Sequence, residues 1–350
     1  MTPKANLLKM IKQLRSPKCC FYFAVTILLT FLSGANTQAA RYITVATIGT
    51  RAFSISSSSN GQVMVDQMIE FYKSELRQVL PDKPDLILFP EGSDIPRDLT
   101  PEARKAYASA KKNQIQDYLA SVARDNNCYI AFGSMRQVEN GKYNSLVILN
   151  RKGEVEGIYN KNYPTIGEIE GGILPGTEAP IIRCDFGTVA CVICFDLNFE
   201  ELRLRYVKEK PDLILVASMF HGGLAQDSWA FSCQSHMVGS MGFREIPSQI
   251  KNPFGEVLGS STNYFDYAVA RINLDCQLVH LDENWNKLKQ LKARYGPDVI
   301  IHDPGQVGSV LITSEHKSVT VDQMIKEFDI EKLEDYIDRS SQFRMDHIRK

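Results

Sequence analysis

Short apolar runs alternate with amphipathic stretches along most of this 350-residue chain, and this alternation restricts the fold more than any other feature. The runs at residues 42–48, 85–90 and 212–217 are mainly apolar and rich in Ile, Leu and Val, as is typical of strands buried on both faces. Residues 63–79 instead carry apolar side chains at the spacing of one helix face. The pattern predicts a layered α/β domain.

Turn-forming pairs that contain glycine, such as Asn140-Gly141, separate several of the strand-like runs, as they do in β-hairpins. Hairpins among alternating strands and helices indicate mixed sheets rather than a purely parallel sheet. Further helices are expected at residues 101–124, 200–208 and 229–239. Further strands are expected at residues 129–133, 143–149, 155–159, 181–184, 188–195, 248–251, 257–260 and 267–272.

The first 40 residues are expected to lie outside this fold. Lys and Arg are the only charged residues before Arg41, an apolar run occupies residues 21–32, and small and polar residues follow as far as Ala40. This order is typical of a secretory signal peptide, and the apolar run is shorter than the roughly 20 residues that a spanning helix needs. We expect cleavage near Ala39 or Ala40 and export to the periplasm or the medium; an uncleaved leader would instead tether the protein to a membrane.

The remainder of the chain is expected to form one domain with a short extension. No linker rich in Gly, Ser or Pro divides residues 41–318, which we interpret as one folded domain. Residues 319–350 are charged, helical in pattern and poor in apolar residues. They predict a C-terminal helical tail that is exposed or packs on a partner subunit.

Composition and cysteine spacing argue against a nucleic-acid binder and against a metal site built on cysteines. The 40 Lys and Arg residues are balanced by 41 Asp and Glu residues, whereas a dedicated nucleic-acid binder normally has a basic excess. Cys191 and Cys194 form a C-x-x-C pair, but they lie on a predicted strand, where positions three apart face opposite ways. No second pair or paired His completes a metal site. A disulfide oxidoreductase that uses Cys191 and Cys194 is left open as an alternative. Whether disulfides form among Cys128, Cys184, Cys191, Cys233 and Cys276 is also left open.

Three reactive side chains each come directly after a strand-like run. Glu91 follows the run LILFP, Lys161 follows IYN, and Cys194 follows VI. Strand ends are where open α/β folds place their reactive groups. A carboxylate can take the proton of a thiol, and an ammonium stabilises both the thiolate and a later oxyanion. Taken singly, these residues are also explained as a loop carboxylate, a solvated lysine and an inert thiol, so the prediction rests on all three together.

The motifs LILFPE, YNK and VICFD, in this order, resemble those of the nitrilase superfamily of carbon–nitrogen hydrolases over residues 42–275. Nitrilases usually carry Cys-Trp-Glu where this chain has Cys194-Phe195-Asp196, so the chain is similar to the amidase and carbamoylase branches. The resemblance implies a four-layer α-β-β-α sandwich and a homodimer or higher homo-oligomer. It also implies a reaction on a small-molecule amide without a metal or organic cofactor.

The resemblance further implies a role for each matched residue. Cys194 would attack the carbonyl carbon of a small amide or N-carbamoyl compound, and Glu91 would transfer the protons. Lys161 and the backbone N–H of Phe195 would hold the oxyanion. The same residues would serve an acyltransferase in which an amine or lipid replaces water, and a catalytically silent binding protein is a second alternative.

One further residue of the family pattern is undecided in this chain, and another position departs from that pattern. Many relatives have a further Glu near the substrate, and Glu170 is our candidate, with Glu168 as its competitor. Leu204 stands where relatives often carry Arg, so the pocket is expected to differ in detail.

Overall fold

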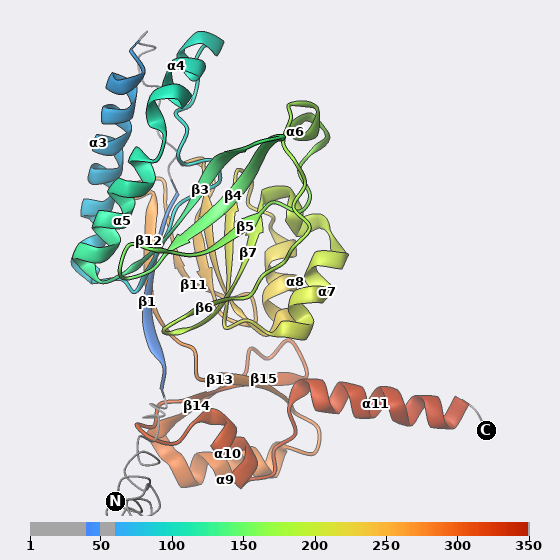
Figure 1. The fold of residues 1–350 in the computed structure, drawn as a ribbon. Coiled ribbons are helices and arrows are strands. Elements are labelled where there is room, and N and C mark those ends of the chain that lie inside the picture. Colours follow the sequence, from blue (N-terminus) through green and yellow to red (C-terminus); the bar gives the residue numbers. More distant parts are fainter. Residues whose placement is uncertain (1–39, 50–59, 349–350) are drawn as a thin grey trace, which may run out of the picture.

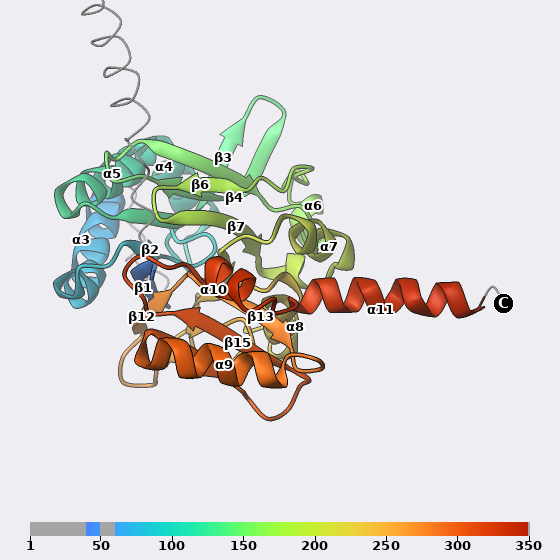
Figure 2. The same cartoon turned by 90° about the horizontal axis from the view of Figure 1, so that it is seen from below.

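The computed structural model describes residues 40–49 and 60–348 (Figure 1). The expected leader, apart from Ala40, lies outside the described residues. Two six-stranded mixed sheets pack face to face, and helices cover the outer face of each sheet (Figures 1 and 2). This arrangement is the four-layer α-β-β-α sandwich, so the predicted fold class is confirmed.

The first sheet has the strand order β12-β1-β2-β3-β4-β5. Its middle strands β1, β2 and β3 are parallel, and the outer pairings are antiparallel. The strands span Tyr42–Ile48 (β1), Leu86–Leu88 (β2), Tyr129–Val138 (β3), Gly141–Leu149 (β4), Val155–Asn160 (β5) and Tyr267–Asn273 (β12).

The second sheet has the order β11-β10-β9-β8-β7-β6, again with three parallel strands in the middle, β7, β8 and β9. The strands span Ile182–Cys184 (β6), Gly187–Ile193 (β7), Leu213–Ser218 (β8), His236–Met241 (β9), Gln249–Lys251 (β10) and Val257–Ser260 (β11).

Helices α3, α4 and α5 cover the first sheet, and α7 and α8 cover the second (Figure 1). Both faces of the middle strands are therefore buried, which explains their continuous apolar runs. In β2, Leu86 and Leu88 face the core between the sheets, whereas Ile87 faces the helices. The helices span Gly61–Val79 (α3), Pro101–Lys111 (α4), Gln114–Asn126 (α5), Ile166–Glu170 (α6), Glu200–Glu209 (α7) and Leu224–Cys233 (α8).

Three predicted boundaries are wrong. The single helix expected at residues 101–124 is divided into α4 and α5 at Lys112, whose φ is +40°. The helix expected at 229–239 ends at Cys233, and the apolar run after it is strand β9. A run this short fits a helix and a buried strand equally well by periodicity. The strand expected at 188–195 ends at Ile193, immediately before Cys194.

A third sheet, with the order β13-β15-β14, was not predicted. It has its own apolar cluster beneath helices α9 and α10. Val321, Met324 and Ile325 of α10 are buried in this cluster, so the expectation of few apolar anchors after residue 319 is wrong for α10. The elements span Cys276–His280 (β13), Trp285–Tyr295 (α9), Val299–His302 (β14), Ser309–Ser314 (β15) and Val321–Glu327 (α10).

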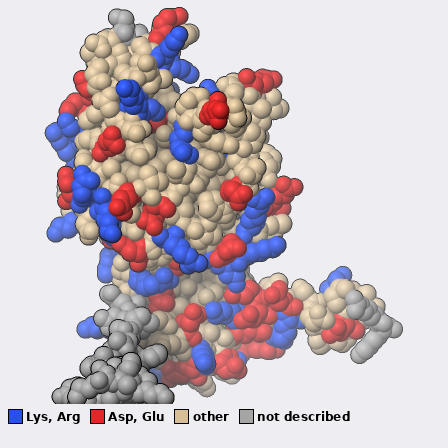
Figure 3. Space-filling model, viewed as in Figure 1, with Lys and Arg blue, Asp and Glu red and all other residues tan. Residues whose placement is uncertain are grey.

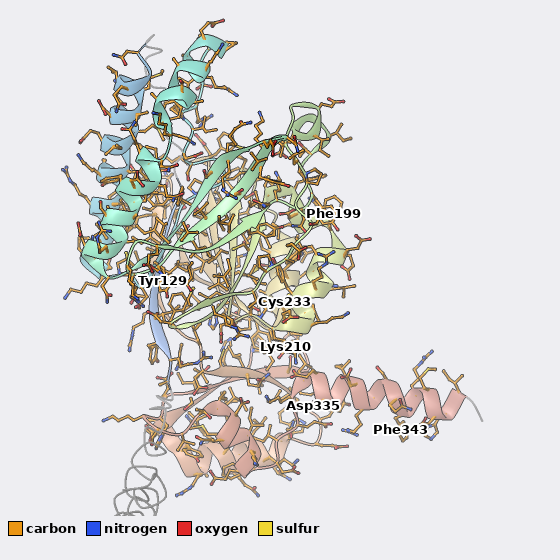
Figure 4. All side chains as sticks on the ribbon, viewed as in Figure 1. Tyr129, Phe199, Lys210, Cys233, Asp335 and Phe343 are labelled. Carbon is orange, nitrogen blue, oxygen red and sulfur yellow. The ribbon has the colours of Figure 1, made fainter. Side chains whose placement is uncertain are left out.

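The last helix, α11 (Leu333–Ile348), contains no buried residue and projects away from the rest of the protein (Figures 1 and 2). Glu334 anchors its first turn by an ion pair with Lys210 of 2.6 Å. Phe343 lies on the projecting part and is 65% exposed (Figure 4). Packing of this helix on a partner subunit stays a prediction. Within the part of the chain that the structure describes, no helix is long and apolar enough to span a membrane.

The two C-terminal helices should differ in their effect on stability. Met324→Ala leaves a cavity in the buried cluster of the third sheet and should lower the free energy of unfolding by roughly 2–5 kcal/mol. Phe343→Ala removes an exposed side chain and should change it by less than about 0.5 kcal/mol. Urea unfolding of both variants beside the unchanged protein measures the difference. Equal effects would contradict the packing described for α10.

Candidate active site

The segment that carries Glu91 follows β2 and is held from three sides. The hydroxyls of Tyr72 (α3) and Tyr107 (α4) each donate a hydrogen bond of 2.8 Å to a backbone carbonyl of this segment. On the third side lies Gly133 of β3, where an added Cβ would lie 2.4 Å from two backbone atoms of the segment. Only glycine therefore allows the Glu91 segment to pack this closely on β3.

Lys161 follows β5 and is buried between two carboxylates, with only 1% of the residue exposed. Its Nζ donates to Glu91 Oε1 at 2.9 Å and to Glu168 Oε2 at 2.8 Å. The buried amide of Asn144 donates to Glu91 Oε1 at 2.7 Å and to Glu168 Oε1 at 3.0 Å. One cation and one amide thus hold both carboxylates in place.

This network keeps Lys161 and Glu168 charged. Burial by itself lowers the pKa of Lys161, but the negative charges and hydrogen bonds of Glu91 and Glu168 outweigh it and raise the pKa above its usual value. Burial by itself raises the pKa of Glu168, but hydrogen bonds from Lys161 and the Thr165 backbone N–H lower the pKa below its usual value. At neutral pH the ammonium and the Glu168 carboxylate are both ionised.

The other oxygen of Glu91, Oε2, is buried and has no hydrogen-bond partner in the part of the chain that the structure describes. Buried polar atoms are normally paired, so an unpaired carboxylate oxygen indicates a place for a proton or a ligand. Glu91 therefore has one oxygen committed to the network and one available for chemistry.

Cys194 lies at a sharp turn at the end of β7. Its φ is +51°, in the left-handed region that non-glycine residues rarely adopt, and the five-residue 3-10 turn Cys194–Asn198 begins there. Such strained conformations concentrate at functional positions. The thiol interacts with the Ser218 hydroxyl and the Met219 backbone N–H at the end of the neighbouring strand β8.

The thiol of Cys194 is protonated at rest. Burial and, next, the negative charge of Glu91 raise its pKa to about 11, although Met219, Lys161 and Ser218 act in the opposite direction. Glu91 and Lys161 are therefore close enough to influence the thiol electrostatically. A reaction of this thiol at neutral pH needs a base to remove its proton.

Asp196 fixes the turn that carries the thiol. Its buried carboxylate accepts hydrogen bonds from the Tyr159 hydroxyl and the Tyr163 backbone N–H, both at 2.7 Å, and from the Ile193 backbone N–H at 3.0 Å. It thereby joins the end of β5 in the first sheet to the end of β7 in the second. Burial raises the pKa of Asp196 to about 6.

The structure brings Glu91, Lys161 and Cys194 together, but it brings Glu168 rather than Glu170 to Lys161. Glu170 is exposed at the end of α6, and within the described ranges no hydrogen bond or ion pair joins it to the site. Thr165 and Glu168 form a capping box, which turns the Glu168 side chain back at the start of the helix. Glu170 comes two residues later, about 200° further round the helix. The Thr-x-x-Glu spacing was the sequence signal that could have selected Glu168.

The structure also places Phe195 and the remaining cysteines. Phe195 is 36% exposed, and its backbone N–H is near the start of the turn, where helical N–H groups have no acceptor within the turn. Cys191 is fully buried in β7, and the six cysteines at residue 128 and beyond are free thiols. Across residues 40–49 and 60–348, no group of three or more His, Cys, Asp or Glu residues could hold a metal ion.

Comparison with known families shows the family to which this chain belongs. The sequence model described as carbon-nitrogen hydrolase matches residues 44–240, which is more than half of the chain. The chain belongs to the carbon-nitrogen hydrolase family. The match includes Glu91, Lys161 and Cys194, and the predicted membership in the nitrilase superfamily is confirmed.

Two curated members of the superfamily are distantly similar to this chain. Nitrilase homolog 2 of Dictyostelium discoideum is 22% identical over 202 residues, which cover 53% of this chain and 62% of that protein. Deaminated glutathione amidase of Rattus norvegicus is 24% identical over 156 residues, 38% of this chain and 48% of that protein. The chain thus spans about half to three-fifths of the length of these curated relatives.

Solved structures show the shared fold. The C. elegans NitFhit protein superimposes with a TM-score of 0.58 at 15% sequence identity, covering 83% of this chain and 98% of that chain. At this identity the likeness concerns the architecture of the hydrolase and not its substrate.

Asp196→Asn should disturb the carbon-nitrogen hydrolase site from within. One oxygen of Asp196 accepts two of the hydrogen bonds and the other accepts the third, so the NH₂ group of Asn would face at least one donor, and the free energy of unfolding should fall by about 2 kcal/mol or more. The rate at which iodoacetamide alkylates Cys194 should change as well, because the turn loses its anchor. Asp338→Asn, on the exposed face of α11, is the matched control and should change neither quantity. Unchanged stability and alkylation in Asp196→Asn would remove this residue from its positioning role.

Proposed function

We propose that this protein hydrolyses the carbon–nitrogen bond of a small amide or N-carbamoyl compound through a thioester on Cys194. One observation carries the proposal. Glu91 binds Lys161 and Asn144 through one oxygen, while its other buried oxygen is unpaired. Glu91 also acts electrostatically on the thiol of Cys194, whose pKa is raised to about 11. At neutral pH this thiol needs a base to remove its proton. Base, cation and nucleophile therefore have the complementary properties that acyl transfer needs.

In the first half-reaction, Cys194 Sγ bonds to the carbonyl carbon while its proton passes to Glu91 Oε2. The carbonyl oxygen becomes an oxyanion, which the Lys161 ammonium and the Phe195 backbone N–H stabilise. The C–N bond then breaks as Glu91 returns the proton to the nitrogen. Ammonia or an amine leaves, and the acyl group remains on sulfur.

In the second half-reaction, Glu91 takes a proton from water, and the oxygen of that water bonds to the thioester carbon. The C–S bond breaks, the carboxylic acid leaves, and the proton returns to the sulfur. An acyltransferase would share the first half-reaction and differ only in the acceptor that replaces water.

Glu168 and Asn144 act through their neighbours. Glu168 balances the buried ammonium of Lys161 when Glu91 becomes protonated during the cycle, so Lys161 stays charged when the oxyanion needs it. Asn144 fixes the distance between the two carboxylates. We assign both as positioning residues. The family membership and the amidase named among the relatives support amide hydrolysis as the reaction class.

Ammonia release from a panel of substrates tests the reaction. The panel contains short aliphatic amides, amides of dicarboxylic acids, N-carbamoyl amino acids and a few nitriles. Cys194→Ala should reduce release by at least about 1,000-fold. Cys191→Ala, the matched control that also tests a redox pair, should stay within about threefold of the unchanged protein. Equal loss in both variants would favour the disulfide chemistry over the hydrolase.

The role of Glu91 as a base can be separated from its electrostatic effect. Glu91→Gln removes a negative charge that raises the pKa of Cys194, so electrostatics alone predicts faster alkylation by iodoacetamide at pH 7. Loss of the base instead predicts alkylation slower by roughly 100-fold. We expect the slower rate, with a rise of about tenfold per pH unit as direct ionisation of the thiol takes over. Faster alkylation at pH 7 would show that Glu91 is not the base.

A further inference from the structure

A cavity of about 1060 Å³ opens beside the candidate active site. It begins at Glu168, runs along the hairpin of β3 and β4, and reaches residues 92–98 and α4. In the space-filling view a hollow lies between the lobe of α4 and the lobe of α6, with both basic and acidic side chains near it (Figure 3). Glu168, which binds Lys161 directly, is part of the lining, so one end of the cavity meets the ion-pair network of the candidate site.

Basic side chains on several elements line the cavity. They are Arg97, Arg104, Lys111, Lys112, Arg136 and Lys142. Three acidic residues also line the cavity, Asp94, Asp98 and Glu168, so the basic residues outnumber them six to three; Asp94 pairs with Lys111 and Glu168 pairs with Lys161. The cavity is therefore positive, although the whole chain has a net charge of −1. A cleft of one charge sign concentrates ligands of the opposite sign.

Lys142 is placed to act on a bound substrate. In the hairpin, Lys142 pairs with Gln137 and Asn144 pairs with Met135, so Lys142 and Asn144 lie two residues apart on one strand and on the same face. Their Cα atoms are about 7 Å apart. Asn144 contacts both carboxylates of the site, and Lys142 therefore lies one step further from the reacting groups on the same surface.

The position of Lys142 is fixed while its charge is left available. Its backbone carbonyl accepts a hydrogen bond of 2.8 Å from Leu174, and a parallel bridge joins it to Ile173. The side chain is half-buried. No carboxylate lies within ion-pair distance of its ammonium among residues 40–49 and 60–348.

Arg97 lies on another wall of the same cavity. Its guanidinium stacks over the ring of Phe243 at 4.7 Å from the ring centre. Stacking of this kind holds the guanidinium plane in place and leaves its edge free to donate hydrogen bonds to a carboxylate or phosphate. The cavity thus offers the guanidinium of Arg97, whose orientation is fixed, and the flexible ammonium of Lys142.

We infer that the substrate carries an anionic group, remote from the scissile C–N bond, which Lys142 and Arg97 bind. This inference rests on the proposed function and specifies its substrate class. A carboxylate and a phosphate-type group share the required chemistry, and a neutral amide of the same size does not. The monoamide of a dicarboxylic acid is the simplest compound with both required parts.

The test compares the monoamide of pentanedioic acid with the neutral diamide of the same acid. The unchanged protein should favour the monoamide in kcat/KM by at least about tenfold. Lys142→Met and Arg97→Met should each lose most of this preference through a higher KM for the anion, while kcat/KM for the neutral diamide stays within about twofold. The preference should also fall as salt is added, because salt screens a partly exposed charge.

Matched variants separate charge from damage to the fold. Lys142→Arg keeps the charge and should keep the preference, whereas Lys105→Met removes an exposed lysine of α4 that does not line the cavity and should change nothing. 3-Phosphonopropanamide, used as a third substrate, shows whether the pocket prefers a phosphate-type group to a carboxylate. A neutral amide preferred by the unchanged protein, with hydrolysis that depends on Cys194, would overturn the inference and leave the proposed function intact.

A binding measurement keeps the inference testable if no amide is hydrolysed. Titration calorimetry of pentanedioate and of 3-phosphonopropanoate into Cys194→Ala should give saturable binding. Adding Lys142→Met to that variant should weaken it by roughly tenfold. Absence of binding by either anion would overturn the inference, whereas binding without hydrolysis would support it and count against the proposed function.

Discussion

The buried ammonium of Lys161 is the interaction on which the rest of this site depends. An isolated charge in a protein interior is costly, and removal of one partner of a buried pair leaves that cost uncompensated. Here Glu91 at 2.9 Å and Glu168 at 2.8 Å both balance the charge. Lys161 follows β5, Glu91 follows β2 and Glu168 lies in α6. The contacts that balance the charge of Lys161 therefore also fix how these three segments meet.

The two sheets supply different parts of the chemistry. Glu91 and Lys161 follow strands of the first sheet, and Cys194 follows a strand of the second. The apolar core between the sheets therefore sets the distance between Glu91 and Cys194, and Asp196 reinforces it by joining the ends of β5 and β7. In such close-packed interiors a change of side-chain volume is transmitted to neighbouring elements, so positions deep in the core bear on the geometry of the reaction.

Other elements form the basic cavity, to which we assign the selection of a substrate. The β3–β4 hairpin, residues 92–98 and α4 lie beyond the strand ends and form the walls of the basic cavity. Connecting segments of this kind can vary while the strands that hold the reacting groups stay fixed. The fold therefore separates the strand ends that hold Glu91, Lys161 and Cys194 from the elements that form the basic cavity.

The sequence by itself placed Glu91, Lys161 and Cys194 at or near strand ends, because each follows a local apolar run, although the end of the strand before Cys194 was predicted two residues too late. It also contained the Thr165–Glu168 capping box, a local signal that selects Glu168 over Glu170. Only the tertiary structure decided the partners of Asn144 and Asp196, since their contacts join segments far apart in the chain. The same holds for the third sheet, whose strands β13 and β15 pair across some thirty intervening residues. Such contacts depend on how whole elements pack, and no short stretch of sequence specifies them.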